Sequence, residues 1–331
     1  MAALAAAPAP VAPGELATLQ GRRRKDDACL ARPHGIPGLD IGKERHPILP
    51  ARDSRGLKPI GRVTSAMPYL AVRDIDICFD RAGTGAPLLA ISGSRGDLRR
   101  KPNLLESPLA KAFDVLAYDQ RGLGRTSKPD QPYSMSDYAD DAAALMDAVG
   151  WERANIVGLS FGGMVALELA IRHPDRVAKL ALCCTSPGGD GGASYPLHTV
   201  QELPADERAR LMVSISDTRC DAAWAAGNPG RMEELLRGFG DDPFADEPGH
   251  QTGISRLLQA RGKHDTWERL VRIRCPVLIC GGRYDGIALP ASQERMASRI
   301  RGASLRMFEG GHYFLWQDSS AFSEIVRFLA E

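Results

Sequence analysis

A sharp turn from strand to helix is the strongest constraint that this sequence places on its fold. Residues 155–157 are typical of a buried strand, and residues 161–171 are typical of a helix. Between them lies Gly158-Leu159-Ser160-Phe161-Gly162, the G-x-S-x-G pattern that places a serine at the apex of such a turn. A side chain two residues before or after the serine would clash, so glycine occupies both positions. The pattern makes Ser160 a candidate nucleophile.

Strand-like and helical segments alternate along the chain from about residue 67 onward. Strands are predicted at 75–79, 87–91, 113–118, 155–157, 178–183, 276–280 and 304–308, and helices at 137–149, 161–171 and 322–329. Strands separated by helices imply a mostly parallel sheet with helices on both faces. We therefore predict an α/β fold.

The pattern changes between Ser186 and Thr266, where the chain is rich in glycine and charge and shows no clear strand. Two short helices are predicted there, at 206–215 and 231–239. We interpret residues 187–265 as a helical insertion that caps the carboxyl ends of the strands, where ligands bind in open α/β sheets. It would divide the core into two parts, 67–186 and 266–331.

Residues 1–66 differ in composition from the rest of the chain. They hold eight of the 23 prolines and 11 Lys/Arg against six Asp/Glu, without sustained periodicity. Such a segment buries too little apolar surface to offset its ordering entropy, so we predict a disordered extension. The basic run 22–25 follows an Ala/Pro stretch, which is the wrong order for a secretory signal. One hypothesis is that translation starts at Met67, and the intact mass from the native host would test it.

The overall composition excludes several classes of function. The net charge of +1 over 331 residues creates no global field toward nucleic acid or a membrane surface. No run of 18 apolar residues predicts a membrane span. The seven cysteines form no C-x-x-C pair and no zinc spacing. We expect buried free thiols in a reducing, cytoplasmic compartment.

A serine nucleophile needs a base and an acid that orients the base, and in this fold they follow the serine in the order acid, then histidine. Of the seven histidines, only His312 follows a late predicted strand, in a Gly-Gly-His loop. Asp285 lies just beyond the strand 276–280, in a glycine-containing turn. We predict His312 as the general base and Asp285 as the acid that stabilises it.

An oxyanion requires two backbone N–H donors. One is expected from Phe161, the residue after the nucleophile, at the N-terminus of the helix. The other is expected from the loop Ser92-Gly93-Ser94-Arg95-Gly96 after the strand 87–91. Its glycines allow an amide to turn inward, and Ser94 is the predicted donor.

Taken together, these motifs resemble those of the α/β-hydrolase superfamily over residues 68–331. The matches are the elbow around Ser160, the segment 119–127 (Asp-Gln-Arg-Gly-Leu-Gly-Arg-Thr-Ser), the Asp285 turn and the Gly311-His312 pair. The resemblance implies that Asp119 and Arg121 tie loops together beside the site. One departure is Ser92-Gly93, where the superfamily usually has His-Gly.

The resemblance, most specifically to enol-lactonase-like and carboxylesterase-like members, implies a serine hydrolase of a small-molecule carboxylic ester or lactone. It also implies that neither a metal nor an organic cofactor is needed. Amide or peptide hydrolysis, carbon–carbon bond hydrolysis and cofactor-free perhydrolysis share the same triad and remain open. A catalytically silent binding protein on this fold is the alternative from another class. Trp224 and Phe239 are candidates for substrate selection in the cap, although such residues more often pack.

Overall fold

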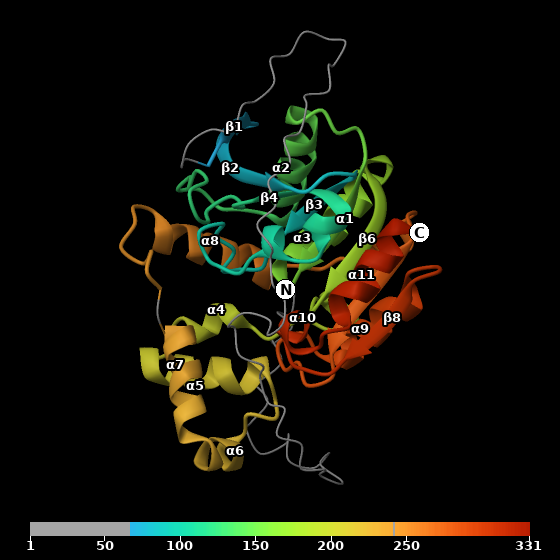
Figure 1. Ribbon diagram of the computed structural model, residues 1–331. Helices are drawn as coiled ribbons and strands as arrows, with labels where there is room; N and C mark the ends of the chain where they lie inside the picture. The colour runs from blue at the N-terminus through green and yellow to red at the C-terminus, as the bar shows by residue number, and fades with distance from the viewer. Residues whose placement is uncertain (1–66, 241) are drawn as a thin grey trace, which may run out of the picture.

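An eight-stranded sheet runs through the computed structural model, which describes residues 67–240 and 242–331 (Figure 1). The strands are β1 Tyr69–Val72, β2 Ile75–Ala82, β3 Ala86–Ile91, β4 Phe113–Tyr118, β5 Ala154–Leu159, β6 Val177–Cys183, β7 Val277–Gly282 and β8 Ser304–Phe308. Their order is β1-β2-β4-β3-β5-β6-β7-β8. β2 pairs antiparallel with both β1 and β4, and every later pair is parallel. The predictions for residues 1–66 lie outside the described residues.

Helices follow most of the parallel strands. They are α1 Leu109–Ala112, α2 Met135–Ala148, α3 Phe161–Arg172, α4 Leu197–Val200, α5 Ala205–Ser216, α6 Ala222–Gly227, α7 Pro229–Gly240, α8 His250–Gly262, α9 Pro290–Arg299, α10 Phe314–Gln317 and α11 Ala321–Ala330. Short 3₁₀ turns are η2 Leu104–Glu106, η3 Pro174–Arg176, η4 Gly189–Gly191 and η5 Trp267–Arg272. Among these residues, no helix has the length and apolar character needed to cross a bilayer.

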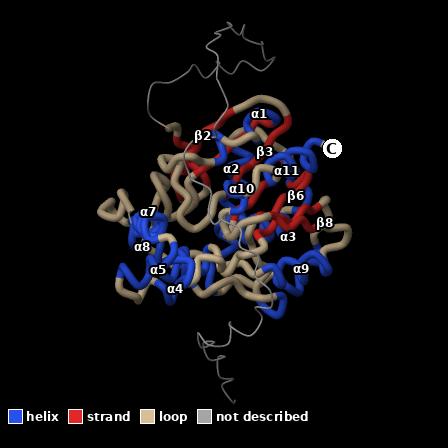
Figure 2. The backbone as a smooth tube through the Cα atoms, turned by 60° about the horizontal axis from the view of Figure 1, so that its bottom comes forward, coloured by secondary structure: helices blue, strands red, loops and turns tan. Residues whose placement is uncertain are grey.

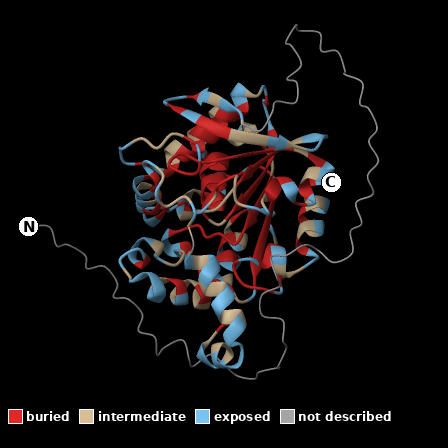
Figure 3. Ribbon diagram, turned by 60° about the vertical axis from the view of Figure 1, so that its left-hand side comes forward, coloured by how far each residue is buried: buried red, intermediate tan, exposed pale blue. Residues whose placement is uncertain are grey.

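The core lies on both faces of the sheet, as the near-continuous burial of the central strands requires. Leu89 and Ile91 of β3 pack in the cluster that holds α2, α3 and α9, whereas Leu88 and Ala90 pack in the cluster that holds α1 and α11. Figure 3 shows the strands as the buried centre of the molecule and the exposed residues on the outer faces of the helices. The predicted α/β fold with helices on both faces is confirmed.

The parallel register brings several strand ends to one edge of the sheet. Ile91 of β3 pairs with Gly158 of β5, and Leu159 pairs with Cys183 of β6. β6 pairs with β7 in the same direction, and β7 with β8. The loops after β3, β5, β7 and β8 therefore lie side by side, and these loops carry the predicted site residues.

The segment between β6 and η5 forms helices α4 to α8, which gather on one side of the molecule (Figures 1 and 2). Its two ends meet where they join the core. The backbone N–H of Thr266 donates to the carbonyl oxygen of Pro187 over 2.8 Å, and Gly188 forms a bridge with Asp265. We call residues 187–265 the helical insertion.

Two long helices and one strand are absent from the sequence prediction. Glycine is a poor helix former, so Gly253 weakens the helical pattern of α8. It is needed at this position because a Cβ there would overlap the carbonyl oxygen of Gly122. α9 begins with Pro290, which is well suited to the first helical position. β1 is a four-residue edge strand with only one buried residue, too short to show a pattern.

Candidate active site

Ser160 occupies the apex of the turn between β5 and α3. Its φ of 53° and ψ of −116° lie in a region that non-glycine residues rarely adopt, at a cost of roughly 1–3 kcal/mol. The turn is held by a hydrogen bond from the Ser160 N–H to the carbonyl oxygen of Cys183 (2.8 Å) and by the Thr185 hydroxyl, which donates to the Ser160 carbonyl oxygen (2.8 Å). The surrounding structure therefore maintains a strained conformation that exposes the serine side chain to the strand edge.

The glycines of the elbow are required by close packing. A Cβ on Gly158 would lie 2.5 Å from the carbonyl oxygen of Gly162, and a Cβ on Gly162 would overlap the carbonyl oxygen of Ile91. Both contacts are closer than real Cβ atoms allow. The elbow is thus packed directly against the end of β3, from which the predicted oxyanion loop departs.

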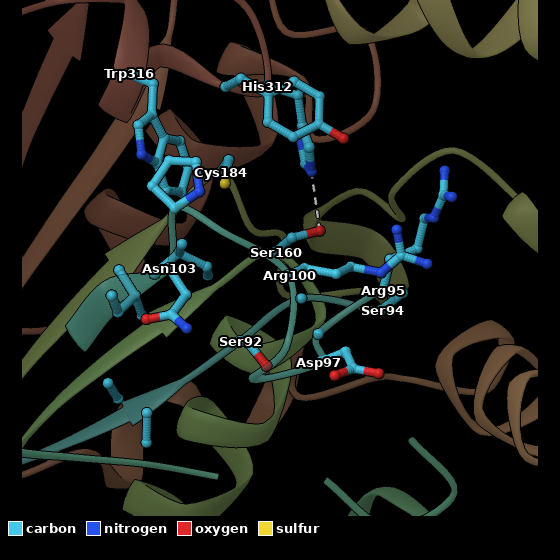
Figure 4. A pocket seen from close by; sticks show the side chains of 18 of the residues that line it. Ser92, Ser94, Arg95, Asp97, Arg100, Asn103, Ser160, Cys184, His312 and Trp316 are labelled. Carbon is cyan, nitrogen blue, oxygen red and sulfur yellow. Dashed lines mark hydrogen bonds between the residues drawn. The ribbon is translucent and has the colours of Figure 1, made fainter. Parts of the chain in front are cut away.

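The structure brings Ser160, His312 and Asp285 into one hydrogen-bonded chain. The Nδ1 atom of His312 lies 2.8 Å from Oδ2 of Asp285, and its Nε2 atom lies 2.9 Å from Oγ of Ser160 (Figure 4). A carboxylate can only accept, so Nδ1 donates to Asp285 and Nε2 is left to accept the serine proton. This is the arrangement that a serine nucleophile, a base and an orienting acid require.

The acid is buried and fully partnered. The side chain of Asp285 has no exposed surface, and its Oδ1 atom accepts hydrogen bonds from the backbone N–H groups of Ile287 (2.8 Å) and Ala288 (2.9 Å). These two bonds fix one carboxylate oxygen and leave the other toward His312. Asp285 is therefore positioned by its own turn, as expected of an acid that orients a base.

The predicted oxyanion loop runs beside the serine. A Cβ on Gly93 would lie 3.4 Å from Cβ of Ser160. Ser94 and Ser160 both line one pocket, which is described below. The Phe161 side chain is fully buried and meets Tyr138 edge-on at 4.9 Å, so only its backbone can serve the site. The Oγ atom of Ser94 is buried without a hydrogen-bond partner among the described residues.

A pocket of about 260 Å³ opens at Ser160. Its wall combines residues of the core with Leu197 and Met212 of the helical insertion. In Figure 4 Trp316 lies on one side of Ser160, and Arg95 and Arg100 lie on the other. Apolar residues dominate the remaining wall, including Leu98, Leu104, Leu159 and Ile287. The cavity suits a small molecule with a largely apolar body.

The basic side of the pocket is held by contacts with the insertion. Arg95 donates to the carbonyl oxygen of Phe239 (3.2 Å), and Arg100 pairs with Asp242 (2.5 Å). Burial lowers the pKa of Arg95 from its ordinary value, while the negative charge of Asp242 opposes that shift. The insertion is therefore tied electrostatically to the loop beside Ser160.

Neither Trp224 nor Phe239, the aromatic candidates for substrate selection, lines the pocket. The Phe239 ring packs against Tyr313 at 6.1 Å, so it supports the wall from behind. The aromatic residues in the wall are Tyr118, at the end of β4, and Tyr313 and Trp316, which follow the histidine. Tyr313 and Trp316 follow His312 by one and four residues. Their place directly after the predicted base is the feature of the sequence that could have identified them as wall residues.

The segment after β4 ties loops together, as its resemblance implied. Arg121 is buried and pairs with Asp74 and Asp141, at 2.6 Å and 2.8 Å. Asp119 accepts from the backbone N–H groups of Leu98 and Arg125, both at 2.8 Å. Burial raises the pKa of Asp119 to about 6 despite these two bonds. Neither Asp119 nor Arg121 lines the pocket.

The six cysteines in the described part of the chain are free and buried. Cys184 lies in the pocket wall, with a φ of 45°. Burial raises the pKa of its thiol well above the ordinary value. Residues 67–240 and 242–331 contain no group of three or more His, Cys, Asp or Glu side chains that could hold a metal ion.

Comparison with known families gives the same assignment as the site. The model of the alpha/beta hydrolase fold family matches residues 90–319, which include the elbow, the acid turn and the histidine loop. The chain belongs to this α/β-hydrolase family.

Relatives of this α/β hydrolase act on different compounds. The 2-hydroxymuconate semialdehyde hydrolase of Pseudomonas sp. (strain CF600) is 40% identical over 278 residues, 76% of this chain and 89% of the relative. A protein of Caulobacter sp. (strain K31), provisionally named a carbamate hydrolase, is 32% identical over 222 residues, 66% of this chain and 81% of the relative. The enol-lactonase of Burkholderia xenovorans LB400 has a TM-score of 0.66 at 27% identity and covers 80% of this chain and 100% of its own.

Proposed function

We propose that this α/β hydrolase cleaves a carboxylic ester or lactone of a small molecule through an acyl-enzyme on Ser160. The observation that carries the proposal is the chain of hydrogen bonds from Ser160 through His312 to Asp285, at 2.9 Å and 2.8 Å. Ser160 and His312 both line a pocket of about 260 Å³. The strained backbone of Ser160 adds support, because a binding protein gains nothing from maintaining it.

The reaction follows from the positions of the atoms. Nε2 of His312 removes the proton of the Ser160 hydroxyl as Oγ attacks the carbonyl carbon. The backbone N–H groups of Phe161 and Ser94 are the proposed donors to the resulting oxyanion. The imidazolium then protonates the leaving alcohol oxygen, or the ring oxygen of a lactone, and the acyl-enzyme forms. His312 next activates a water molecule, which releases the acid and restores Ser160.

The helical insertion is proposed to act as a cap that selects the substrate. Leu197 and Met212 are its contributions to the pocket wall. The core parts on either side, 67–186 and 266–331, would then provide the chemistry, and residues 187–265 the selectivity. We propose a cytoplasmic location as well, because the buried free thiols suit a reducing compartment.

A second candidate is hydrolysis of a carbon–carbon bond, and the 40% identity to the 2-hydroxymuconate semialdehyde hydrolase favours it. The substrate in that name contains neither an ester nor a lactone, so its hydrolysis breaks a carbon–carbon bond. The same serine, base and oxyanion donors could serve either reaction. The two candidates differ in the leaving group that His312 must protonate. It is an alkoxide when an ester or lactone is cleaved, and a carbanion when a carbon–carbon bond is cleaved.

Fluorophosphonate labelling tests the nucleophile. Wild type should be labelled, whereas Ser160→Ala should resist labelling and lose about 10⁴–10⁶ in kcat. His312→Ala should lose a similar amount of kcat, because it removes the base. His173→Ala is its matched control and should keep the wild-type kcat, because His173 pairs with Asp140 away from the pocket. A folded wild type that takes no label would overturn the proposal. A panel of esters, lactones, aminoacyl amides and 2-hydroxymuconate semialdehyde then separates the candidate bonds.

A further inference from the structure

The end of helix α5 in the insertion contacts both loops that carry the acid and the base. The backbone N–H of His312 donates to the carbonyl oxygen of Ser216 over 2.6 Å. The N–H of Gly286, directly after Asp285, donates to the carbonyl oxygen of Ile215 over 2.9 Å. Two consecutive carbonyl groups at the end of α5 thus hold the backbone on each side of the pair formed by Asp285 and His312.

The contact with the histidine loop is close. A Cβ on Gly311 would overlap the carbonyl oxygen of Ser216 and lie 2.8 Å from Cα of Asp217. Glycine is therefore required directly before the histidine, because the backbone of the insertion occupies the space of a side chain. A small shift of the insertion at this point must be transmitted to His312.

Asp217 provides a second connection, through a glutamine. Its side chain is fully buried, pairs with Arg219 at 2.7 Å and accepts from Nε2 of Gln317 at 3.2 Å. The opposite end of that amide, Oε1 of Gln317, accepts from the N–H of Gly311 at 2.8 Å. An amide has one donor end and one acceptor end. Because Asp217 can only accept, it determines which end of Gln317 faces Gly311.

We propose that Asp217 is a positioning residue for the general base. It holds the Gln317 amide in the orientation that fixes Gly311, and the adjoining Ser216 carbonyl fixes His312 itself. The proposal rests on the proposed function of His312. Met212, on the same helix, lines the pocket, so the insertion supplies both part of the substrate wall and the support of the base.

The test exploits the polarity of the amide. Oδ1 of Asp217 accepts from the backbone N–H and Nε of Arg219, at 3.1 Å and 2.9 Å, whereas Oδ2 faces Gln317. In Asp217→Asn the amide oxygen keeps the position beside Arg219, and the NH₂ group faces Nε2 of Gln317. Two donors then oppose each other, so the Gln317 amide reverses and Gly311 loses its acceptor. In the double variant Asp217→Asn/Gln317→Glu the carboxylate of residue 317 accepts from both the new amide and Gly311. Asp217→Asn should lower kcat for p-nitrophenyl acetate by on the order of 10–100-fold with KM within about twofold, because a displaced base affects the chemical step. The double variant should recover most of this loss.

Asp140→Asn is the matched control, since it also removes a carboxylate from a cationic pair but on α2, outside the pocket. It should keep the wild-type kcat. A wild-type kcat in folded Asp217→Asn, or no recovery in the double variant, overturns the proposal. If Asp217→Asn does not fold, Gln317→Met removes the same connection from the core side, and a wild-type kcat there overturns it equally.

Failure of the proposed function gives a different result. In that case wild type itself is neither labelled by fluorophosphonate nor active on any ester. If instead wild type is labelled and active while both the Asp217 and Gln317 variants match it, only the positioning role is wrong.

Discussion

Gln120 and Ser92 are joined across two neighbouring strands: Nε2 of Gln120 donates to the carbonyl oxygen of Ser92 over 2.7 Å. Gln120 lies just beyond β4 and is fully buried, whereas Ser92 is the first residue after β3. The bond fixes the start of the loop that carries Ser94, the proposed oxyanion donor. A side chain outside the pocket thereby controls the geometry of a group inside it.

We predict that Gln120→Leu lowers kcat about tenfold, because a displaced oxyanion loop weakens one of two N–H donors. The rate of fluorophosphonate labelling should fall with kcat, since both reactions need the oxyanion donors. Gln131→Leu is the control, because Gln131 bonds only the exposed side of Asp74. Unchanged labelling in a folded Gln120→Leu would show that the loop holds its shape without the glutamine.

Asp285→Asn should cost about 10⁴ in kcat while leaving the fold intact. The new amide can still accept from the N–H groups of Ile287 and Ala288 through its oxygen. Its NH₂ group then faces Nδ1 of His312 and forces the proton onto Nε2, where the serine proton must be received. Single-turnover kinetics would measure the effect, and a loss of less than tenfold would mean that another group orients His312.

Gly162→Ala should abolish activity while causing little change in secondary structure. Its Cβ would overlap the carbonyl oxygen of Ile91 and lie 2.5 Å from that of Ser92, so the elbow and the oxyanion loop must separate. Gly227→Ala is the matched control, because nothing lies within 4 Å of a Cβ there. Activity and circular dichroism measured together distinguish a displaced site from a lost fold, and a fully active Gly162→Ala would contradict the packing described.

The parts of the site that follow local rules were predictable from the sequence. An elbow needs glycine beside Ser160, and the chain order Ser, Asp, His follows from the order of the strands. The burial of Asp285 and the position of His312 beside Ser160 then follow from the order of the strands in the sheet. The catalytic roles of Ser94 and Phe161 stay predictions.

Other parts depend on contacts between distant segments, which no local pattern records. Met212 lines the pocket only because α5 packs over the core at that point. Gln120 and Asp217 cannot be told from the other polar residues of the sequence until their hydrogen-bond partners are known. α8 escaped prediction for the same reason, since Gly253 is explained only by the backbone of Gly122 beside it. The residues of the proposed triad could be selected from the sequence, whereas the contacts that support them depend on tertiary packing.

His264, where the insertion returns to the core, should make stability depend on pH. Its pKa is lowered to about 4, mainly by burial and also by the charges of Arg269 and Arg261, while the Ser186 backbone and the charge of Asp265 oppose the shift. An unfolded histidine titrates near 6.5, so between pH 6.5 and 4 only the unfolded chain binds the proton. Its contribution to stability is therefore lost as the pH falls through this window, and is unchanged above it.

Comparison with His264→Gln isolates this effect. The difference in unfolding free energy between wild type and variant should change by roughly 2–3 kcal/mol between pH 7.5 and 4.5, to the disadvantage of wild type. Asp119 acts in the opposite sense, because its raised pKa of about 6 favours the folded state as the pH falls. It is common to both proteins and cancels. Urea unfolding at the two pH values measures the difference, and parallel losses in both proteins would exclude His264 as the cause.

The meeting of the two ends of the insertion at Pro187 and Thr266 bears on how such an enzyme can change during evolution. A loop closed at one point costs only about 0.6 kcal/mol more for each doubling of its length. Insertions of other lengths can therefore be exchanged at this junction while the strands behind Ser160 keep their paths. The exchange has a condition, because any replacement must still offer carbonyl oxygens to the N–H groups of His312 and Gly286. New substrate preferences can arise by replacing a whole segment, provided that the new segment reproduces these backbone contacts beside the acid and the base.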